Sequence, residues 1–230
     1  FYDLGRRLTI DRMHDYLTPF GFGHRTGIDT TNERPGVLPS TRWKRETMNQ
    51  PWYPGETISA SIGQGYMLAT PLQLASAAAT LATRGTRYRP HMVAAWEDPL
   101  TGERQLVRPE RLNDVEIDNE FYWETVIDAM HSVLQGARGT ARAVGTGAPY
   151  SMAGKSGTAQ VFTVAQEEEY DEEEIEYRLR DHALFVSFAP VENPQIAVAV
   201  IVENGSSGSR VAAPVARAIM DQYLGINDAP

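Results

Sequence analysis

Residues 148–162 read APYSMAGKSGTAQVF, and the expected architecture of the chain follows from them. Lys155, one of only two lysines in the sequence, stands directly before Ser156, and residues that favour strands follow. Because successive side chains of a strand alternate between its faces, the hydroxyls of Ser156 and Thr158 share one face. The pattern therefore predicts a strand with an exposed edge that carries a cation and two hydroxyls.

These polar groups suit the carboxylate of a peptide. Lys155 supplies three donors and a positive charge, and Ser156 and Thr158 can each donate to the same anion. Gly157 has no side chain to block a ligand lying against the backbone. An edge strand can also pair with an extended peptide through its main chain. A hydrogen bond to a charged group contributes about 1.5–3 kcal/mol, so three such contacts can hold a peptide C-terminus.

Two other interpretations of the Gly-Lys-Ser sequence compete with this one. A phosphate-binding loop, G-x-x-x-x-G-K-[ST], requires glycine five residues before Gly154, but Pro149 stands there, and the residues that follow favour a strand over a helix. The second alternative is a strand edge without any function. Four residues alone do not decide between that alternative and a binding site.

Lys-Ser-Gly-Thr belongs to the motif set of serine penicillin-binding proteins and related β-lactamases, where it accompanies S-x-x-K and S-x-[ND]. The surrounding sequence resembles one branch, the penicillin-binding protein 2 family of elongation-specific, class B D,D-transpeptidases of Gram-negative bacteria. The resemblance covers nearly all of residues 1–225. The segments that carry it are 11–15, 20–23, 26–29, 36–39, 57–59, 63–66, 155–162, 178–182, 188–190 and 202–205.

The resemblance implies a reaction and a role for each motif residue. In the family, a serine attacks the penultimate D-alanine carbonyl of a peptidoglycan stem peptide, and the acyl group then passes to an amine on a neighbouring strand. Lys155 and Thr158 would be catalytic, with the N–H of Thr158 forming half of the oxyanion hole. Lys155, Ser156, Gly157 and Thr158 would bind the substrate. β-Lactams, which mimic the D-alanyl-D-alanine end, are expected to acylate the intact domain.

The chain departs from the family pattern because it contains neither S-x-x-K nor S-x-[ND]. Thr41 and Met152 stand three residues before the two lysines. The segment Thr41–Lys44 follows Ser40 at an expected helix start, where these hydroxyl residues serve as caps. We therefore expect residues 1–225 to be the C-terminal portion of a transpeptidase domain, followed by a tail at 226–230. This portion should be inactive alone and stable only with the missing N-terminal part.

Composition sets few further limits. With 230 residues, 42% of them hydrophobic, the chain is long enough for one substantial domain. The net charge is −9, but residues 167–176 hold eight acids, so the acidity is local. No basic patch indicates a nucleic-acid partner, and no apolar run reaches the roughly 18 residues of a membrane helix. Without cysteine, disulfides and thiolate metal sites are excluded.

We expect no cofactor. We also expect no metal site, because His131 and the other four histidines lack partners at metal-ligand spacing. By resemblance, the expected partners are peptidoglycan stem peptides, β-lactams, the missing N-terminal part of the same protein and membrane proteins of the elongation machinery. The resemblance also implies a periplasmic domain with a membrane anchor outside this sequence. The alternative function is a non-catalytic peptide- or β-lactam-binding scaffold module, and nucleotide binding ranks third.

The fold class expected from the pattern is α+β, an antiparallel sheet packed against helices. Thr70, Pro71 and Gln73 predict a helix start with a capping box. Residues 195–204 favour a strand, and the apolar run 196–202 within it suits burial on both faces. The acidic run 167–176 is expected to project as a loop. Further elements are expected at 1–20 (two helices broken near Thr9), 87–95 and 103–107 (a hairpin), 118–134 (a helix), 182–190 (a strand) and 212–224 (a helix). The apolar residues expected on or near one face of the 118–134 helix are Phe121, Val126, Met130, Val133 and Leu134.

Overall fold

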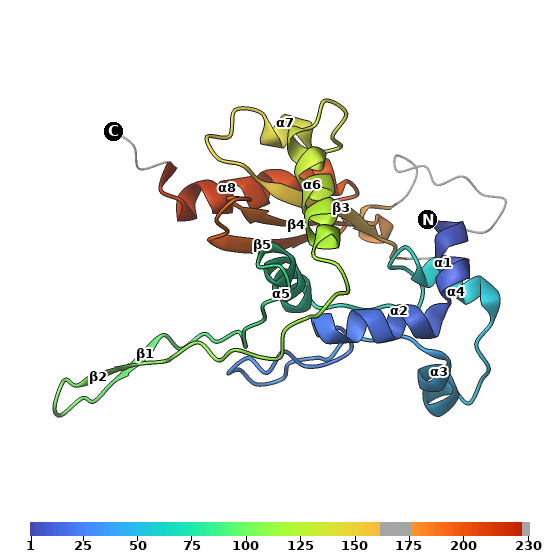
Figure 1. Ribbon diagram of the computed structural model, residues 1–230, viewed down its shortest axis with the longest axis horizontal. Helices are drawn as coiled ribbons and strands as arrows, with labels where there is room; N and C mark the ends of the chain where they lie inside the picture. Colours follow the sequence, from blue (N-terminus) through green and yellow to red (C-terminus); the bar gives the residue numbers. More distant parts are fainter. Residues whose placement is uncertain (162–175, 227–230) are drawn as a thin grey trace. The chain divides into compact units, whose positions relative to one another are not determined.

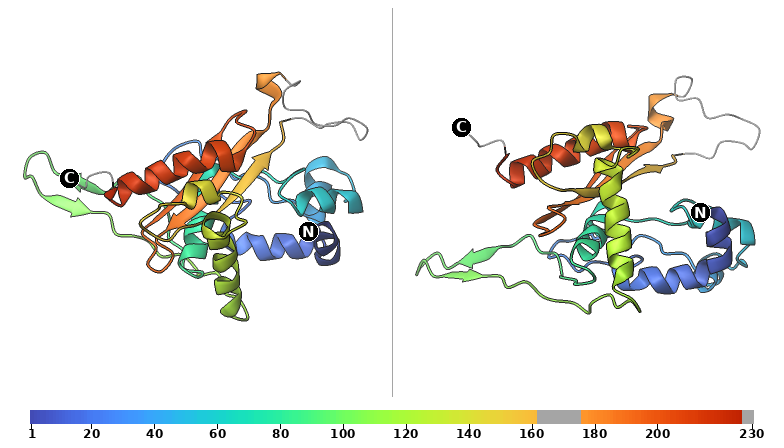
Figure 2. Two further views of the ribbon diagram at one scale, coloured as in Figure 1. Left: turned by 90° about the horizontal axis from the view of Figure 1, so that it is seen from above. Right: turned by 45° about the horizontal axis from the view of Figure 1, so that its top comes forward.

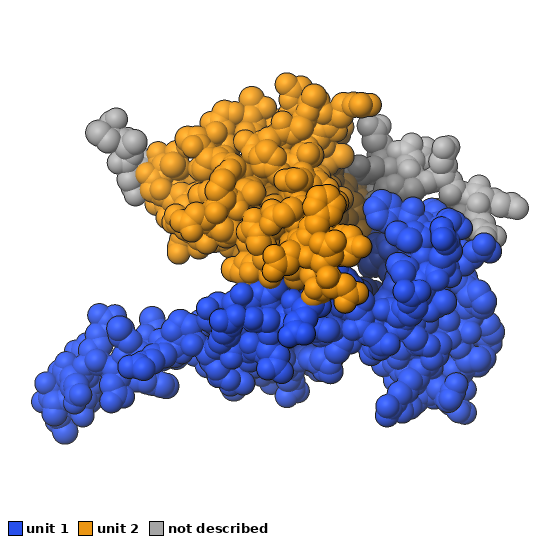
Figure 3. All heavy atoms as spheres, viewed as in Figure 1, with its two compact units in different colours: residues 1–80, 85–116 blue, residues 81–84, 117–230 orange. Residues whose placement is uncertain are grey.

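The structure is a computed structural model that describes residues 1–161 and 176–226. It divides into two compact units (Figure 3). Unit 1 contains Phe1–Thr80 and Gly85–Glu116, and unit 2 contains Leu81–Arg84 and the described residues from Ile117 onward. Helices and antiparallel strands make up the described chain (Figure 1), which confirms the α+β prediction. The acidic run predicted as a projecting loop lies, except for Glu176, outside the described residues.

Unit 1 begins with two short helices separated at Thr9, as predicted. Thr9 has a φ of 66°, a left-handed value that a helix cannot continue through, and its N–H caps the first helix by donating to Gly5 O. The helical elements of this unit are α1 (Tyr2–Leu8), α2 (Ile10–Leu17), η1 (Thr18–Phe20), α3 (Thr41–Met48), α4 (Pro54–Ala60) and the greater part of α5 (Pro71–Ala82).

The start of α3 confirms that the Thr41–Lys44 segment is a capped helix start. The Ser40 hydroxyl accepts a hydrogen bond from Trp43 N at 3.0 Å. The Asp11 carboxylate accepts from both Thr41 N and Thr41 Oγ1 at 2.8 Å. Both hydroxyl residues are therefore engaged in satisfying the N–H groups at a helix end or in fixing that end to α2.

The capping box at α5 is confirmed as well. Thr70 N donates to Gln73 Oε1 at 2.9 Å, and Gln73 N donates to Thr70 Oγ1 at 3.2 Å. The Gln73 side chain is buried, and its Nε2 also donates to His24 O at 2.7 Å and Pro35 O at 2.8 Å. One side chain thus caps the start of α5 and holds a loop 38 to 49 residues away in the sequence.

The predicted hairpin is present, but its first strand is shorter and lies later in the sequence than predicted. Strand β1 (Ala95–Glu97) pairs antiparallel with β2 (Arg104–Leu106). The predicted strand at 87–95 is therefore wrong over most of its length. Pro90 cannot donate to a ladder, and the N–H groups of Met92 and Val93 donate instead to the Asp29 carboxylate at 2.7 and 3.0 Å.

Unit 2 is built on a three-stranded antiparallel sheet in the order β3-β4-β5. The strands are β3 (Ala153–Ala159), β4 (His182–Ala189) and β5 (Ile196–Val202), and the bond between Ala189 and Pro190 is cis. Lys155 lies opposite Val186, and Gly157 lies opposite Leu184. Within residues 1–161 and 176–226, β3 pairs with β4 alone, which makes it an edge strand as predicted.

Helices cover both faces of this sheet (Figures 1 and 2). Phe188 and Ala153 pack on one face with residues of α6 (Phe121–Gln135). Phe185 and Val198 pack on the other face with residues of α8 (Ala213–Tyr223). The shorter helical elements of unit 2 are α7 (Arg142–Gly145), η2 (Tyr177–Leu179) and the π-helical turn η3 (Gly208–Ala212).

Two details of burial differ from the sequence-based prediction. On the apolar face predicted for α6, Met130 and Leu134 are buried, but Phe121 and Val126 are 68% and 43% exposed. Trp123 and Ile127 are buried as well, although they were not placed on that face. The sequence of a helix with adjacent apolar stripes does not determine which stripe is buried. Packing against the sheet determines it here. Strand β5 is only half-buried, with Ile201 41% exposed, because in the described chain it pairs with β4 alone.

Candidate active site

The four motif residues lie where β3 emerges from the core of unit 2. Ala153 and Gly154 at the start of the strand are buried, Ser156 and Gly157 are half-buried, and Lys155 and Thr158 are exposed. The strand therefore has one end fixed in the core, and its remaining residues are accessible. This arrangement matches the expected strand edge with polar groups.

The Lys155 ammonium folds toward the adjacent Ser156. Its Nζ donates to Ser156 O at 2.5 Å and lies 3.4 Å from Ser156 Oγ. Alternation puts the two side chains on opposite faces of the strand, so the lysine side chain must cross the strand edge to make these contacts. The structure thus brings together the ammonium and one of the two hydroxyls that the sequence predicted to converge. Thr158 follows two residues later on the face of Ser156.

The two glycines of this segment have different reasons to be glycine. A methyl group on Gly154 would lie 2.8 Å from Val186 O and 2.9 Å from Cε1 of Phe185, so the core leaves no room for it. A methyl group on Gly157 would meet only Leu184 Cβ, at 3.4 Å. Internal packing therefore demands glycine at 154 but not at 157. The bare surface at Gly157 is available to a ligand.

The beginning of β3 is held by Ser151. Its hydroxyl donates to the Glu192 carboxylate and accepts from Val191 N at 2.9 Å. The hydrogen bond from Ser151 is the main reason that the pKa of Glu192 is lowered. These contacts connect the approach to β3 with the turn between β4 and β5.

The far end of β3 lies opposite His182, which has a structural role. Asn204 N donates to His182 Nδ1 at 2.9 Å, so this nitrogen acts as an acceptor in the ring. The Asn204 side chain donates to the carbonyl oxygens of Arg178 and Arg180 at 3.0 and 2.9 Å. The segments 178–182 and 202–205, both singled out in the sequence, therefore meet beside the motif strand.

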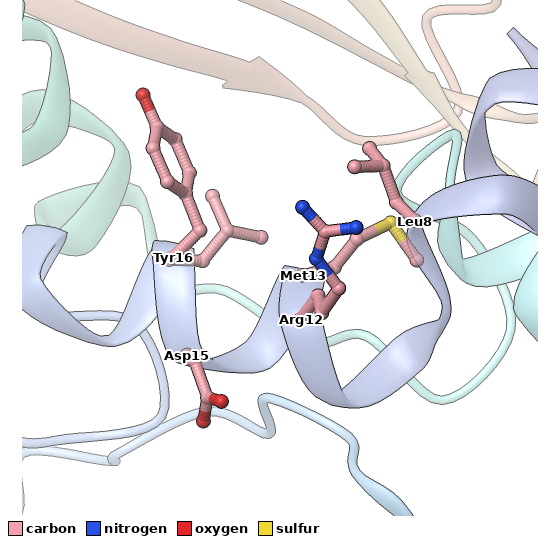
Figure 4. Close-up of a pocket in the computed structure, with 6 residues that line it drawn as sticks. Leu8, Arg12, Met13, Asp15 and Tyr16 are labelled. Carbon is pink, nitrogen blue, oxygen red and sulfur yellow. The ribbon is translucent and has the colours of Figure 1, made fainter. Parts of the chain in front are cut away.

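A cavity of about 690 Å³ lies in unit 1 on α1 and α2, away from the motif residues in the sequence. The residues that line the cavity are Leu8, Arg12, Met13, Asp15, Tyr16 and Leu17. Figure 4 shows Tyr16 and Arg12 projecting on one side of α2, whereas Asp15 points away from them.

Within residues 1–161 and 176–226, no three histidine or acidic side chains are grouped to hold a metal ion. None of the helices in this part of the chain has the length and apolar character needed to span a bilayer.

An edge strand bearing Lys-Ser-Gly-Thr, in an antiparallel sheet between helices, is typical of penicillin-recognising serine enzymes. Sequence comparison agrees with this class. The chain belongs to the penicillin-binding protein transpeptidase domain family, which it matches over residues 1–221.

Its relatives include peptidoglycan D,D-transpeptidases named MrdA. The chain is 40% identical over 226 residues to MrdA of Haemophilus influenzae, covering 97% of this chain and 34% of that protein. It is 40% identical over 227 residues to MrdA of Escherichia coli K12, covering 35% of that protein. The chain therefore spans about a third of the length of these curated relatives.

Solved structures show the same relationship. The crystal structure of Pseudomonas aeruginosa PBP2 in complex with WCK 5153 superimposes with a TM-score of 0.81 and 47% identity, covering 97% of this chain and 46% of that one. PBP2 of Helicobacter pylori, solved in complex with MreC, gives a TM-score of 0.78 and 29% identity, covering 98% of this chain and 38% of that one. The resemblance to the penicillin-binding protein 2 family is confirmed.

Proposed function

We propose that this chain is part of a peptidoglycan D,D-transpeptidase that cross-links stem peptides during cell-wall elongation. The observation that carries the proposal is the β3 edge, where the Lys155 ammonium and the Ser156 hydroxyl lie together on an accessible strand. Membership of the transpeptidase family and 40% identity to D,D-transpeptidases supply the reaction class.

Each motif residue has a chemical role in this proposal. Lys155, Ser156 and Thr158 bind the terminal carboxylate of the stem peptide. Hydrogen bonds to an ionised carboxylate are stronger than those between two neutral groups. Lys155 also takes part in the proton chemistry of the site. The N–H of Thr158 donates to the oxyanion that forms at the attacked carbonyl. Gly157 lets the peptide approach the backbone.

The nucleophile and its base are assigned to another part of the same protein. A serine acyl-enzyme requires both groups, and the 230 residues contain neither S-x-x-K nor S-x-[ND]. Residues 1–225 then form a portion of the transpeptidase domain, with 226–230 as a tail. On this assignment, the chain alone is inactive. The longer protein of which it is a portion, called the parent protein below, forms the acyl-enzyme.

The partners and the location follow from the same proposal. The substrates are peptidoglycan stem peptides, and β-lactams acylate the serine in their place. The H. pylori PBP2 that resembles this chain was solved in complex with MreC, which supports contact with membrane proteins of the elongation machinery. The domain would act in the periplasm, tethered by a membrane anchor elsewhere in the parent protein.

Labelling with a fluorescent penicillin tests the proposal. The parent protein should acquire a covalent label that survives denaturation, whereas residues 1–230 alone should not. A label on the isolated chain would mean that it contains a nucleophile of its own. No label on a folded parent protein would contradict the transpeptidase assignment and favour a non-catalytic scaffold that binds peptides or β-lactams.

A further inference from the structure

The segment that connects β5 to α8 passes directly over the motif strand. Gly208, the first residue of η3, lies against the β3–β4 ladder at the Gly157–Leu184 pair. A methyl group at Gly208 would lie 2.3 Å from Leu184 O, 2.6 Å from Gly157 O and 3.1 Å from Gly157 N. Real Cβ atoms almost never approach within 3.0 Å of such atoms. Only glycine fits here without a movement of several tenths of an ångström.

The contact reaches the atom that the proposed mechanism uses. The carbonyl of Gly157 and the N–H of Thr158 belong to one planar peptide group. Any displacement of Gly157 O therefore also moves the Thr158 N–H. No flexible side chain lies between Gly208 and this peptide group to absorb the strain, because the three nearest atoms are all backbone atoms.

The strand, rather than the connection, is the part free to yield. Before Gly208, Ser206 N donates to Asp181 O at 2.8 Å. After it, Ala212 and Ala213 are fully buried in the core beneath the sheet. By contrast, β3 has a neighbouring strand on one side only in the part of the chain that the structure describes. A larger residue at 208 would thus displace the β3 edge.

We propose that Gly208 is a positioning residue that sets the place of the Gly157–Thr158 peptide group and, through it, the oxyanion-binding N–H. This inference rests on the proposed function and extends it to a residue outside the Lys-Ser-Gly-Thr motif. Gly208 does not touch the substrate. It acts by allowing the connection to approach the strand closely enough to fix its backbone.

The chain offers two matched controls for a Gly208→Ala variant. The controls are Gly205→Ala and Gly145→Ala. None of the glycines at 145, 205 and 208 has a left-handed φ, so alanine brings no backbone strain of that kind. In Gly205→Ala, the new methyl group would meet side-chain carbons of Val202 and Ala183 at 3.0–3.1 Å, in the same connection but with no atom of β3 among its nearest neighbours. In Gly145→Ala, it would lie 2.2 Å from Leu134 O, an equally severe backbone clash between α7 and α6.

The first test is hydrogen exchange in the parent protein, followed for peptides that cover residues 153–161. Gly208→Ala should speed exchange in this segment by about tenfold or more, because a displaced edge strand loses ladder hydrogen bonds. Gly205→Ala and Gly145→Ala should leave this segment unchanged. Exchange at the wild-type rate in Gly208→Ala, or the same change in all three variants, would overturn the proposal.

The second test is the rate of covalent labelling by a fluorescent penicillin, measured with the melting temperature. Misplacement near 1 Å costs about 10²-fold in a catalytic step, so Gly208→Ala should slow acylation by about 10- to 100-fold. Gly145→Ala should lose as much thermal stability but acylate at the wild-type rate. Slow labelling in proportion to lost stability in every variant would reduce Gly208 to a structural residue. If wild-type parent protein takes no label, the proposed function fails, and the exchange experiment still decides the positioning role.

Discussion

The two lysines of this chain show how differently one residue type is used in two regions. Lys44 in α3 is 1% exposed, and its ammonium pairs with Glu56 among the rings of Trp52, Tyr53 and Tyr66. Lys155 on β3 is exposed, and its ammonium donates to the adjacent Ser156. A buried cation surrounded by aromatic faces and a carboxylate has its charge compensated internally. An exposed one on a strand edge is available to an external anion.

Replacing each lysine by methionine in the parent protein should separate these roles. Lys155→Met should have the largest effect on chemistry and slow acylation by a β-lactam by about 10²-fold or more, because a charged hydrogen bond and a proton-transfer group are lost together. Its melting temperature should stay near that of the wild type, since the side chain is exposed. Stopped-flow or gel-based labelling measures the rate. An unchanged rate would remove Lys155 from the mechanism.

Lys44→Met should show the opposite behaviour. Methionine nearly fills the same space, but it leaves the Glu56 carboxylate without its cation and the three rings without their charge partner. We expect a loss of about 2–3 kcal/mol in the free energy of unfolding, below the usual cost of breaking a fully buried pair because Glu56 is 22% exposed. Chemical denaturation measures it. Acylation by the folded protein at the wild-type rate is the expected control, and a loss of labelling without a loss of stability would break the comparison.

The Lys44–Glu56 pair should also make stability depend on acid. Burial raises the pKa of Glu56, but the hydrogen bonds from Lys44 and Tyr53 N outweigh it, and the net pKa lies below the usual 4.5. A carboxylate whose pKa is lowered in the folded state stabilises that state at any pH above its unfolded pKa. This contribution is lost as the pH falls through the folded pKa. Glu56→Gln should therefore lose about 1–2 kcal/mol at pH 7. The difference from wild type should shrink below about pH 4.5, as melting temperatures measured across pH 3–7 would show. A constant difference would mean that the charge of Glu56 is not what stabilises α4.

The smallest expected effect concerns a buried hydroxyl in the sheet of the Lys155 region. Ser187 of β4 is fully buried, and its Oγ has no hydrogen-bond partner among the described residues. Because an unpaired buried hydroxyl is costly, Ser187→Ala should leave stability unchanged or raise it by up to about 1 kcal/mol. Ser151→Ala, which removes two hydrogen bonds at the start of β3, is the matched control and should lower stability. A clear loss in Ser187→Ala would show that this hydroxyl has a partner.

Local signals in the sequence predicted the elements whose ends are fixed by neighbouring residues. Ser40 caps α3, and Thr70 with Gln73 caps α5, through hydrogen bonds between residues three apart. The motif strand was predicted for the same reason, since its alternation and composition are contained in a few residues. The Lys-Ser-Gly-Thr segment also carried the family resemblance, which the comparison with transpeptidases confirmed.

The predictions that failed concern features that depend on contacts with segments distant in the sequence. The sequence of α6 offers several apolar residues, and only packing against the sheet decided that Trp123 and Ile127 are buried while Phe121 is not. The first strand of the hairpin was predicted at 87–95 but is formed by Ala95–Glu97. The Asp29 carboxylate, about 60 residues away, binds the N–H groups of Met92 and Val93, so they do not pair with the second strand.

The amino-acid sequence by itself therefore determined the helix starts, the motif strand and the family. The tertiary structure alone decided that Lys44 is enclosed whereas Lys155 is open, and that Gly208 lies on the Gly157 peptide group. The physical reason is the range of the interactions. Caps and strand alternation involve residues a few positions apart, whereas burial and close backbone approach depend on segments that only the folded chain brings into contact.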